Sequence, residues 1–223
     1  MTRPILLFAA GKGTRMAPLT DTLPKPLITV AGKPLVDHAY DLATDAGCRP
    51  IVINTHYLGH MIRDHVAGRD VLISDEADLL RETGGGLRHA LPLLKADPVV
   101  TMNTDAVWRG PNPVQHLLGA WRDGMECLLL VVEKRNVAGH HGKGDFDRAA
   151  DGRLQRGRDL VYTGLQIIRT DRLAAIGDEV FSMNVVWDAM IRDGGLYGAI
   201  HDGRWCDVGQ PESIPLAEAM CHV

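Results

Sequence analysis

Short apolar runs alternate with amphipathic stretches through the first 130 residues or so. The runs are rich in β-branched residues and each ends at a turn-forming or polar residue: "ILLFAA" (5–10), "PIVINT" (50–55), "DVLIS" (70–74), "PVVTMNT" (98–104) and "CLLLVVE" (127–133). Continuous apolar runs of this length are typical of strands that are buried on both faces of a parallel sheet. The pattern therefore predicts strands at all five places.

The segments between these runs have apolar residues at a spacing of three to four, which is typical of helices packed on a sheet. They are "PLVDHAYDLATDAG" (34–47), "LGHMIRDHVAG" (58–68) and "GGGLRHALPLLK" (84–95). The first two end on glycine, a common helix stop. The alternation predicts an α/β fold: an open, mostly parallel, Rossmann-like sheet with helices on both faces.

The pattern changes after about residue 133. Residues 133–159 are polar and rich in glycine and charge, which indicates loops with short antiparallel strands. A strand is expected at "LVYTGLQIIR" (160–169) and a helix at "FSMNVVWDAMIRDGG" (181–195). "LYGAIHDGRWCDVG" (196–209) is expected to form a strand pair that turns at Asp202-Gly203. No linker or repeat interrupts the sequence, so a single domain over residues 1–223 is the simplest organisation.

Composition excludes several classes of protein. Of 223 residues, 45% are apolar and 23% are charged, as in soluble globular proteins. A net charge of −4 argues against nucleic acid and anionic membranes as partners. No apolar stretch approaches the roughly 18 residues needed to span a membrane. The four cysteines form no C-x-x-C pair, which disfavours a zinc framework and favours a reducing, cytoplasmic environment.

The first strand leads directly into "GKGTR", at the edge of the sheet where open α/β folds bind ligands. Gly11 and Gly13 leave backbone N–H groups open to a phosphate, and Lys12 and Arg15 add positive charge. Neither the P-loop pattern nor the dinucleotide fingerprint is present. On this segment alone, a glycine turn with solvated charges is an equal alternative. Lys25 favours an anion site, because the prolines on both sides restrict its backbone.

Residues 9–27, "AAGKGTRMAPLTDTLPKPL", closely match the signature of the sugar-1-phosphate nucleotidyltransferases, L-A-A-G-x-G-x-R-M-x-P-L-T-x-x-x-P-K-P. Later segments resemble further markers of that family, in order: "RETGGGL" (81–87), "NTDAVW" (103–108), "YTGLQII" (162–168) and "WCDVGQPE" (205–212). The resemblance covers Ile5 to Glu212. The spellings "ETGGG", "GHHGKGDF" and "WCDVG" are most similar to a compact uridylyltransferase branch that acts in bacterial cell-wall sugar recycling.

The resemblance implies a fold, a reaction and a set of roles. In that family, a sugar 1-phosphate attacks the α-phosphorus of a nucleoside triphosphate, here with UTP favoured, and pyrophosphate leaves. Residues 1–133 would form the nucleotide-binding half and residues 134–223 the sugar-binding half. Arg15 and Lys25 would be the catalytic cations, and Asp105 and Asp207 would bind Mg²⁺ as the cofactor.

The resemblance also implies contacts to each substrate. The nucleotide would contact Ala10, Gly11, Gly13, Thr14, Glu76, Glu82, Thr83 and Gly84. In the base loop, glycines would let the planar base lie close; the alternative is that "TGGG" only starts the helix at Leu87. The sugar would contact Asn103, Gly142, Asp145, Thr163, Gly164 and Trp205. His140 and His141 are expected to be a loop feature, and contact with the substrate is the alternative.

Two departures from the family pattern bear on the choice of sugar. Thr104 stands where glycine usually precedes the first metal aspartate, and residues 133–136, "EKRN", are unusually basic for a sugar-facing segment.

A glucose-1-phosphate thymidylyltransferase or a mannose-1-phosphate guanylyltransferase is the alternative within the class. A regulatory protein that binds nucleotide sugars without catalysis is the alternative from another class. A monomer and a homodimer are both compatible with the sequence.

Overall fold

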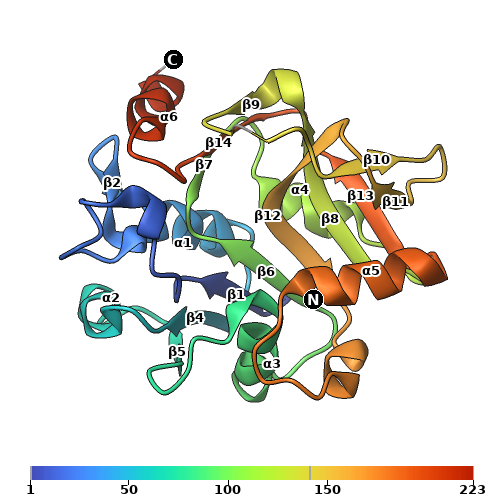
Figure 1. Ribbon diagram of the computed structural model, residues 1–223, viewed down its shortest axis with the longest axis horizontal. Helices are drawn as coiled ribbons and strands as arrows, with labels where there is room; N and C mark the ends of the chain where they lie inside the picture. The colour runs from blue at the N-terminus through green and yellow to red at the C-terminus, as the bar shows by residue number, and fades with distance from the viewer. Residues whose placement is uncertain (1, 141, 223) are drawn as a thin grey trace.

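A twisted central sheet runs through the molecule in this computed structural model, which describes residues 2–140 and 142–222 (Figure 1). Its strands lie in the order β11-β10-β12-β6-β1-β4-β5, with β8 paired to β12 and β13 paired to β8. The strands are β1 (Ile5–Phe8), β4 (Ile51–Thr55), β5 (Leu72–Asp75), β6 (Val99–Asn103), β8 (Cys127–Glu133), β10 (Phe146–Arg148), β11 (Leu154–Arg156), β12 (Leu160–Ile168) and β13 (Leu196–Ile200). All five strands expected in the first 133 residues are present.

Strand direction divides the sheet into two parts. β6, β1, β4 and β5 are parallel neighbours, as expected for strands joined through helices. β12 runs antiparallel to both β6 and β8, and β13 is parallel to β8. One continuous sheet therefore includes strands from both predicted halves of the chain, residues 1–133 and residues 134–223.

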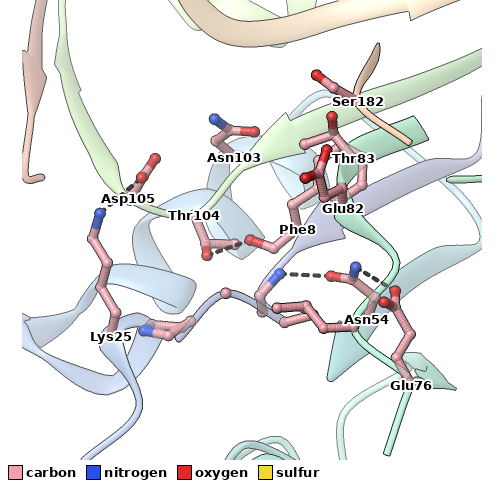
Figure 2. Close-up of a pocket in the computed structure, with 15 residues that line it drawn as sticks. Phe8, Lys25, Asn54, Glu76, Glu82, Thr83, Asn103, Thr104, Asp105 and Ser182 are labelled. Carbon is pink, nitrogen blue, oxygen red and sulfur yellow. Dashed lines mark hydrogen bonds and ion pairs between the residues drawn. The ribbon is translucent and has the colours of Figure 1, made fainter. Parts of the chain in front are cut away.

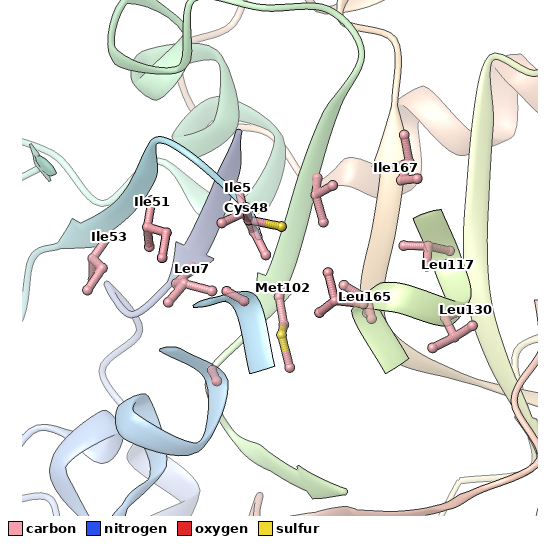
Figure 3. Packing of buried hydrophobic residues seen from close by; sticks show 14 of the residues in the cluster. Ile5, Leu7, Cys48, Ile51, Ile53, Met102, Leu117, Leu130, Leu165 and Ile167 are labelled. Atoms are coloured by element: carbon pink, nitrogen blue, oxygen red, sulfur yellow. The ribbon is translucent and has the colours of Figure 1, made fainter. Parts of the chain in front are cut away.

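Helices cover both faces of this sheet, as predicted. They are α1 (Leu35–Asp45), α2 (Gly59–His65), α3 (Glu82–Leu94), α4 (Pro113–Ala120) and α5 (Met183–Asp193), while α6 (Ser213–His222) lies elsewhere. Alternate residues of β1 point to opposite faces of the sheet. Ile5 and Leu7 belong to one buried cluster with residues of α1, α2 and α4, among them Leu117 of α4 (Figure 3). Leu6 belongs to a second cluster with residues of α3 and α5. Burial on both sides explains why the strands are apolar at consecutive positions.

Shorter elements complete the edge where the strands end. A second sheet has the order β7-β14-β9, formed by β7 (Ala106–Arg109), β14 (Arg204–Asp207) and β9 (Val137–Ala138), and a small hairpin joins β2 (Thr29–Val30) and β3 (Lys33–Pro34). The 3₁₀ turns are η1 (Thr14–Met16), η2 (Lys25–Leu27), η3 (Lys134–Asn136) and η4 (Asp171–Ala175). Helix α6 packs on the second sheet (Figure 1).

The strand pair predicted for residues 196–209 is wrong. β13 joins the central sheet beside β8, whereas β14 pairs with β7 and β9 in the second sheet. Leu196 and Ala199 of β13 are buried, and this burial is available only within the central sheet. The Asp202-Gly203 segment is therefore a crossing between two sheets.

Helix α3 also begins earlier than expected, at Glu82, so that Gly84, Gly85 and Gly86 lie inside its first turns. In the part of the chain that the structure describes, every helix is too short or too polar to cross a bilayer.

Candidate active site

Two cavities meet at the carboxyl ends of β1 and β6. The first has a volume of about 390 Å³ and is lined by Phe8, Ala9, Ala10, Gly11, Lys25, Pro26, Asn54, Glu76, Leu80, Glu82, Thr83, Asn103, Thr104, Asp105 and Ser182 (Figure 2). The second, of about 370 Å³, is lined by Arg15, Thr83, Asn103, Asp105, His140, Asp145, Phe146, Arg156, Tyr162, Gly164, Ser182, Met183, Asn184, Trp187, Trp205 and Asp207. Thr83, Asn103, Asp105 and Ser182 line both, so they form the junction between two ligand-sized spaces.

Lys25 and Asp105 form an ion pair at this junction, with Nζ 2.8 Å from Oδ2 (Figure 2). Lys25 opens the 3₁₀ turn η2 directly after Pro24, and its side chain is only 11% exposed. Asp105 follows β6 and is 32% exposed. The lysine therefore presents its charge at a fixed point in the first cavity, beside the Asp105 carboxylate that lines both cavities.

Gly13 allows the loop after β1 to pack against Lys25. Its φ is +63°, and a Cβ on it would lie 2.9 Å from Cβ of Lys25. The Thr20 hydroxyl donates to Gly13 O at 2.9 Å and fixes this arrangement. Gly11 differs, since a Cβ there would meet no atom within 4 Å. The loop is therefore closed on the protein side and open on the ligand side.

A small third cavity, of about 210 Å³, lies beside this loop. It is lined by Gly11, Gly13, Thr14, Arg15, Lys25, Asp105 and Gly209. Backbone and cationic side chains of this kind suit a phosphate chain. Lys12 is exposed and lies outside the residues that line the three cavities, although the sequence offered it equally with Arg15.

Asp207 is placed beside Asp105 by the second sheet. It pairs with Ala106 in the β14–β7 register, and Val208 N–H donates to Asp105 O at 2.8 Å. Burial raises the pKa of Asp207, and the nearby charge of Asp105 raises it further; Lys25 and Arg15 act in the opposite direction. Two carboxylates that lie close together at the end of a cavity suit a hard divalent cation. Mg²⁺ commonly uses one or two carboxylates together with substrate phosphates, so these residues fit it.

A buried polar chain supports the floor of the first cavity (Figure 2). Ala9 N–H donates to Asn54 Oδ1 at 2.7 Å, and Asn54 Nδ2 donates to Glu76 Oε1 at 2.8 Å. Glu76 is fully buried, and its Oε2 accepts from the backbone N–H of Arg81 at 3.1 Å. Glu76 thus lines the cavity, but its carboxylate is already bonded to the protein.

The glycines of "TGGG" are adjacent to protein, and the expectation that they make room for a base is wrong. A Cβ on Gly84 would lie 2.4 Å from Phe181 Cδ2, and one on Gly86 would lie 2.9 Å from Glu76 Oε1. The N–H groups of Gly84 and Gly85 both donate to Phe181 O. These glycines therefore let the segment before α5 pack onto α3.

Close contact between two strands shapes the second cavity. β12 contains a bulge between Tyr162 and Gln166, where Gly164 has φ +80°. A Cβ on Gly164 would lie 2.7 Å from Asn103 Cβ, so glycine allows Asn103 to reach the junction. Trp205 Nε1 and His140 Nε2 are buried and have no hydrogen-bond partner within the described residues.

Most, but not all, of the residues predicted from the sequence line these cavities. Gly84, Gly142 and Thr163 do not. Thr163 instead donates to Leu130 O at 2.7 Å, and a Cβ on Gly142 would meet His140 Nε2. Lys134 and Arg135 also lie outside the lining, with Arg135 paired to Glu133 at the surface. His141 lies outside the described residues.

Several lining residues were missed from the sequence. His140, Arg156, Tyr162, Asn184 and Trp187 all line the second cavity. Arg156 is one of several arginines in a polar stretch, and nothing in its spacing distinguishes it.

Thr104 has a structural contact: its hydroxyl donates to Phe8 O at 2.7 Å and ties β6 to β1.

The chain belongs to the MobA-like NTP transferase family, which it matches over residues 5–161. It is accordingly a nucleotidyltransferase, as the signature over residues 9–27 predicts. It is 36% identical to the N-acetylmuramate alpha-1-phosphate uridylyltransferase of Caulobacter vibrioides over 96% of this chain and 95% of that protein. It is 32% identical to the protein of the same name from Neisseria meningitidis serogroup B, over 96% of each.

A solved structure supports the fold. The crystal structure of HddC from Yersinia pseudotuberculosis complexed with GMP-PN has a TM-score of 0.81 to this chain at 20% identity. The match covers 98% of this chain and 99% of that one. The sugar-1-phosphate nucleotidyltransferase class and its Rossmann-like fold, both expected from the sequence, are confirmed.

Proposed function

We propose that this enzyme transfers a uridylyl group from UTP to N-acetylmuramate 1-phosphate in a Mg²⁺-dependent reaction that releases pyrophosphate. The observation that carries the proposal is the junction of two cavities at the Lys25–Asp105 ion pair. A transfer between two substrates needs both of them held with their reacting phosphates at one point. The names of the two bacterial relatives supply the base and the sugar.

The nucleoside would occupy the first cavity, with its base near Leu80, Glu82 and Thr83. The triphosphate would then extend along the loop that contains Gly11, Gly13 and Thr14. Arg15 lines both the small third cavity and the second cavity, which we call the sugar-side cavity. Its charge would stabilise the departing pyrophosphate.

Lys25 would neutralise the repulsion between the two phosphates that must approach each other. A sugar phosphate is ionised near pH 7 and attacks without a general base, so orientation and charge are the main requirements. Asp105 and Asp207 would hold Mg²⁺, which supplies further positive charge between the phosphates when it is bound. With Asp105 serving as a metal ligand, Lys25 would be free to donate to the substrate phosphate.

The sugar would occupy the second cavity, against Asn103, Gly164 and Trp205. Asp145 also lines it, but its Oδ2 accepts from Tyr162 N–H at 2.8 Å, which leaves the other carboxylate oxygen for a hydroxyl of the sugar. A site of this kind fits a cytoplasmic enzyme of sugar metabolism, and it implies no nucleic-acid or membrane partner.

Pyrophosphate release from a matrix of five nucleoside triphosphates and several sugar 1-phosphates tests the proposal. UTP with N-acetylmuramate 1-phosphate should give the highest kcat/KM, and EDTA should abolish it. A higher kcat/KM for dTTP with glucose 1-phosphate, or for GTP with mannose 1-phosphate, would establish the alternative activity. No pyrophosphate with any pairing would mean a regulatory binding protein.

A further inference from the structure

Arg156 places a second positive charge in the sugar-side cavity. Arg15 and Asp207 lie at the end of this cavity that meets the triphosphate loop. Arg156 lines the same cavity but belongs to β11, at the far edge of the central sheet. In the proposed function, Lys25 serves the phosphate of the sugar 1-phosphate and Arg15 serves the pyrophosphate. The Arg156 guanidinium therefore has no oppositely charged partner on a neutral sugar.

Protein contacts hold the Arg156 guanidinium in one orientation. Nε donates to Asp188 Oδ1 at 2.9 Å, and Nη2 donates to Asn184 Oδ1 at 2.8 Å and lies 2.8 Å from Asp188 Oδ1. The guanidinium also lies over two aromatic rings, 5.0 Å from the Phe146 centroid and 5.9 Å from that of Trp187. An arginine fixed in this way loses little conformational entropy on binding a ligand.

These contacts leave part of the guanidinium for a ligand. Arginine has five N–H donors, and those on Nε and Nη2 are directed at Asp188 and Asn184. Across residues 2–140 and 142–222, the two donors on Nη1 make no hydrogen bond to protein. The side chain is 41% exposed and lines the cavity. Two donors on one edge of a guanidinium suit a carboxylate oxygen.

We infer that Arg156 determines specificity by binding a carboxylate on the sugar, so that the substrate class is a sugar 1-phosphate with a second anionic group. This inference rests on the proposed function. N-Acetylmuramate differs from N-acetylglucosamine by a lactyl ether that ends in a carboxylate. Arg156 therefore binds the charged group that N-acetylmuramate has and N-acetylglucosamine lacks.

The simpler interpretation is that Arg156 only ties β11 to α5 through Asp188. Three variants separate the two roles. Arg156→Gln removes the charge in the cavity, and Asp188→Asn removes the ionic part of the tie but keeps the arginine. Arg158→Gln is the matched control for net charge, since Arg158 lies outside the lining of the sugar-side cavity.

The measurement is kcat/KM for N-acetylmuramate 1-phosphate and for N-acetylglucosamine 1-phosphate, each with UTP. The wild type should favour the carboxylated sugar, and Arg156→Gln should lower its kcat/KM about tenfold to a hundredfold, as expected for a lost charge-assisted hydrogen bond. The same variant should change kcat/KM for the neutral sugar by less than about threefold. Asp188→Asn and Arg158→Gln should retain the preference of the wild type.

Equal losses on both sugars in Arg156→Gln, or an unchanged ratio, would overturn the inference. If that variant does not fold, an N-acetylmuramate 1-phosphate whose lactyl carboxyl is converted to the amide replaces it, and the wild type should use this amide about tenfold less well than the acid. Equal use of acid and amide would overturn the inference. Absence of turnover with every sugar phosphate would instead remove the proposed function itself.

Discussion

Gly13 and Lys25 lie so close that a Cβ on Gly13 would be 2.9 Å from Cβ of Lys25, whereas Gly11 faces open space. Gly13→Ala should therefore lower the free energy of unfolding by about 1–3 kcal/mol, because φ is positive and the lysine must move. Gly11→Ala should leave stability unchanged and raise the KM for UTP, because its methyl group enters the ligand space. Urea unfolding and pyrophosphate release distinguish the two. Equal effects of the two variants on both measurements would contradict this account of the loop.

Lys25 is expected to act mainly in the reaction. Lys25→Ala should lower kcat by about a hundredfold or more, since one positioned charge at a reacting phosphate commonly contributes that much. Lys12→Ala is the matched control, because Lys12 belongs to the same loop but is exposed and outside the three cavities. Single-turnover release of pyrophosphate is the measurement. A loss of less than about tenfold, or about 1.4 kcal/mol of barrier, would remove Lys25 from the reaction.

Asp207 should show opposite effects on activity and on stability. Its pKa is raised by burial and by the charge of Asp105, so ionised Asp207 destabilises the metal-free fold near neutral pH. Asp207→Asn should therefore increase the melting temperature in EDTA, while the Mg²⁺ concentration for half-maximal activity rises about tenfold or more.

The control for this substitution is Asp202→Asn, an exposed residue near the start of β14. It should shift neither the melting temperature in EDTA nor the requirement for Mg²⁺. An Asp207→Asn enzyme with the Mg²⁺ dependence of the wild type would show that Asp207 is not a ligand.

His201 should make the fold less stable in acid. Burial, and after it the nearby His116, whose Nδ1 lies 3.2 Å from that of His201, lower the pKa of His201 to about 4. An unfolded histidine takes up a proton below about pH 6.5, while the folded one does so only near pH 4. Stability should therefore fall as the pH drops through this window, by up to about 1.4 kcal/mol for each pH unit.

Urea unfolding between pH 7.5 and pH 4.5 measures this effect. His201→Gln cannot titrate and should flatten the pH dependence, whereas His222→Gln, at an exposed position, should leave it as in the wild type. Parallel pH profiles for His201→Gln and the wild type would show that another group is responsible.

The strands that could be predicted are those in which burial on both faces makes consecutive residues apolar. β1, β4 and β6 are apolar at consecutive positions because helices cover both faces, and this pattern is visible without the structure. The partners of β13 and β14 were not predictable from Asp202-Gly203, because a turn signal describes only neighbouring residues. Their pairing depends on β8 and β7, which lie more than 60 residues away in the chain.

The same distinction applies to the candidate site. The loop after β1 and Lys25 lie within one continuous segment, residues 9–27, so a single signature covers these residues, which line one small cavity. The sugar-side cavity is assembled from β10, β11, β12, α5 and β14, and each contributes only a few side chains. Arg156 and Asn184 meet there through tertiary packing, which leaves no spacing for sequence reasoning to detect.

The position of β11 as the last strand of the central sheet separates two properties of this enzyme. Gln155 and Arg156 are both exposed, whereas Leu6 and Leu129, deep in the sheet, are fully buried. Exposed edge positions accept substitutions with little change in stability, while buried positions do not. If Arg156 selects the acceptor as we infer, mutations at this exposed edge can change that selectivity at little cost in stability, while the residues packed around Lys25 are constrained by burial.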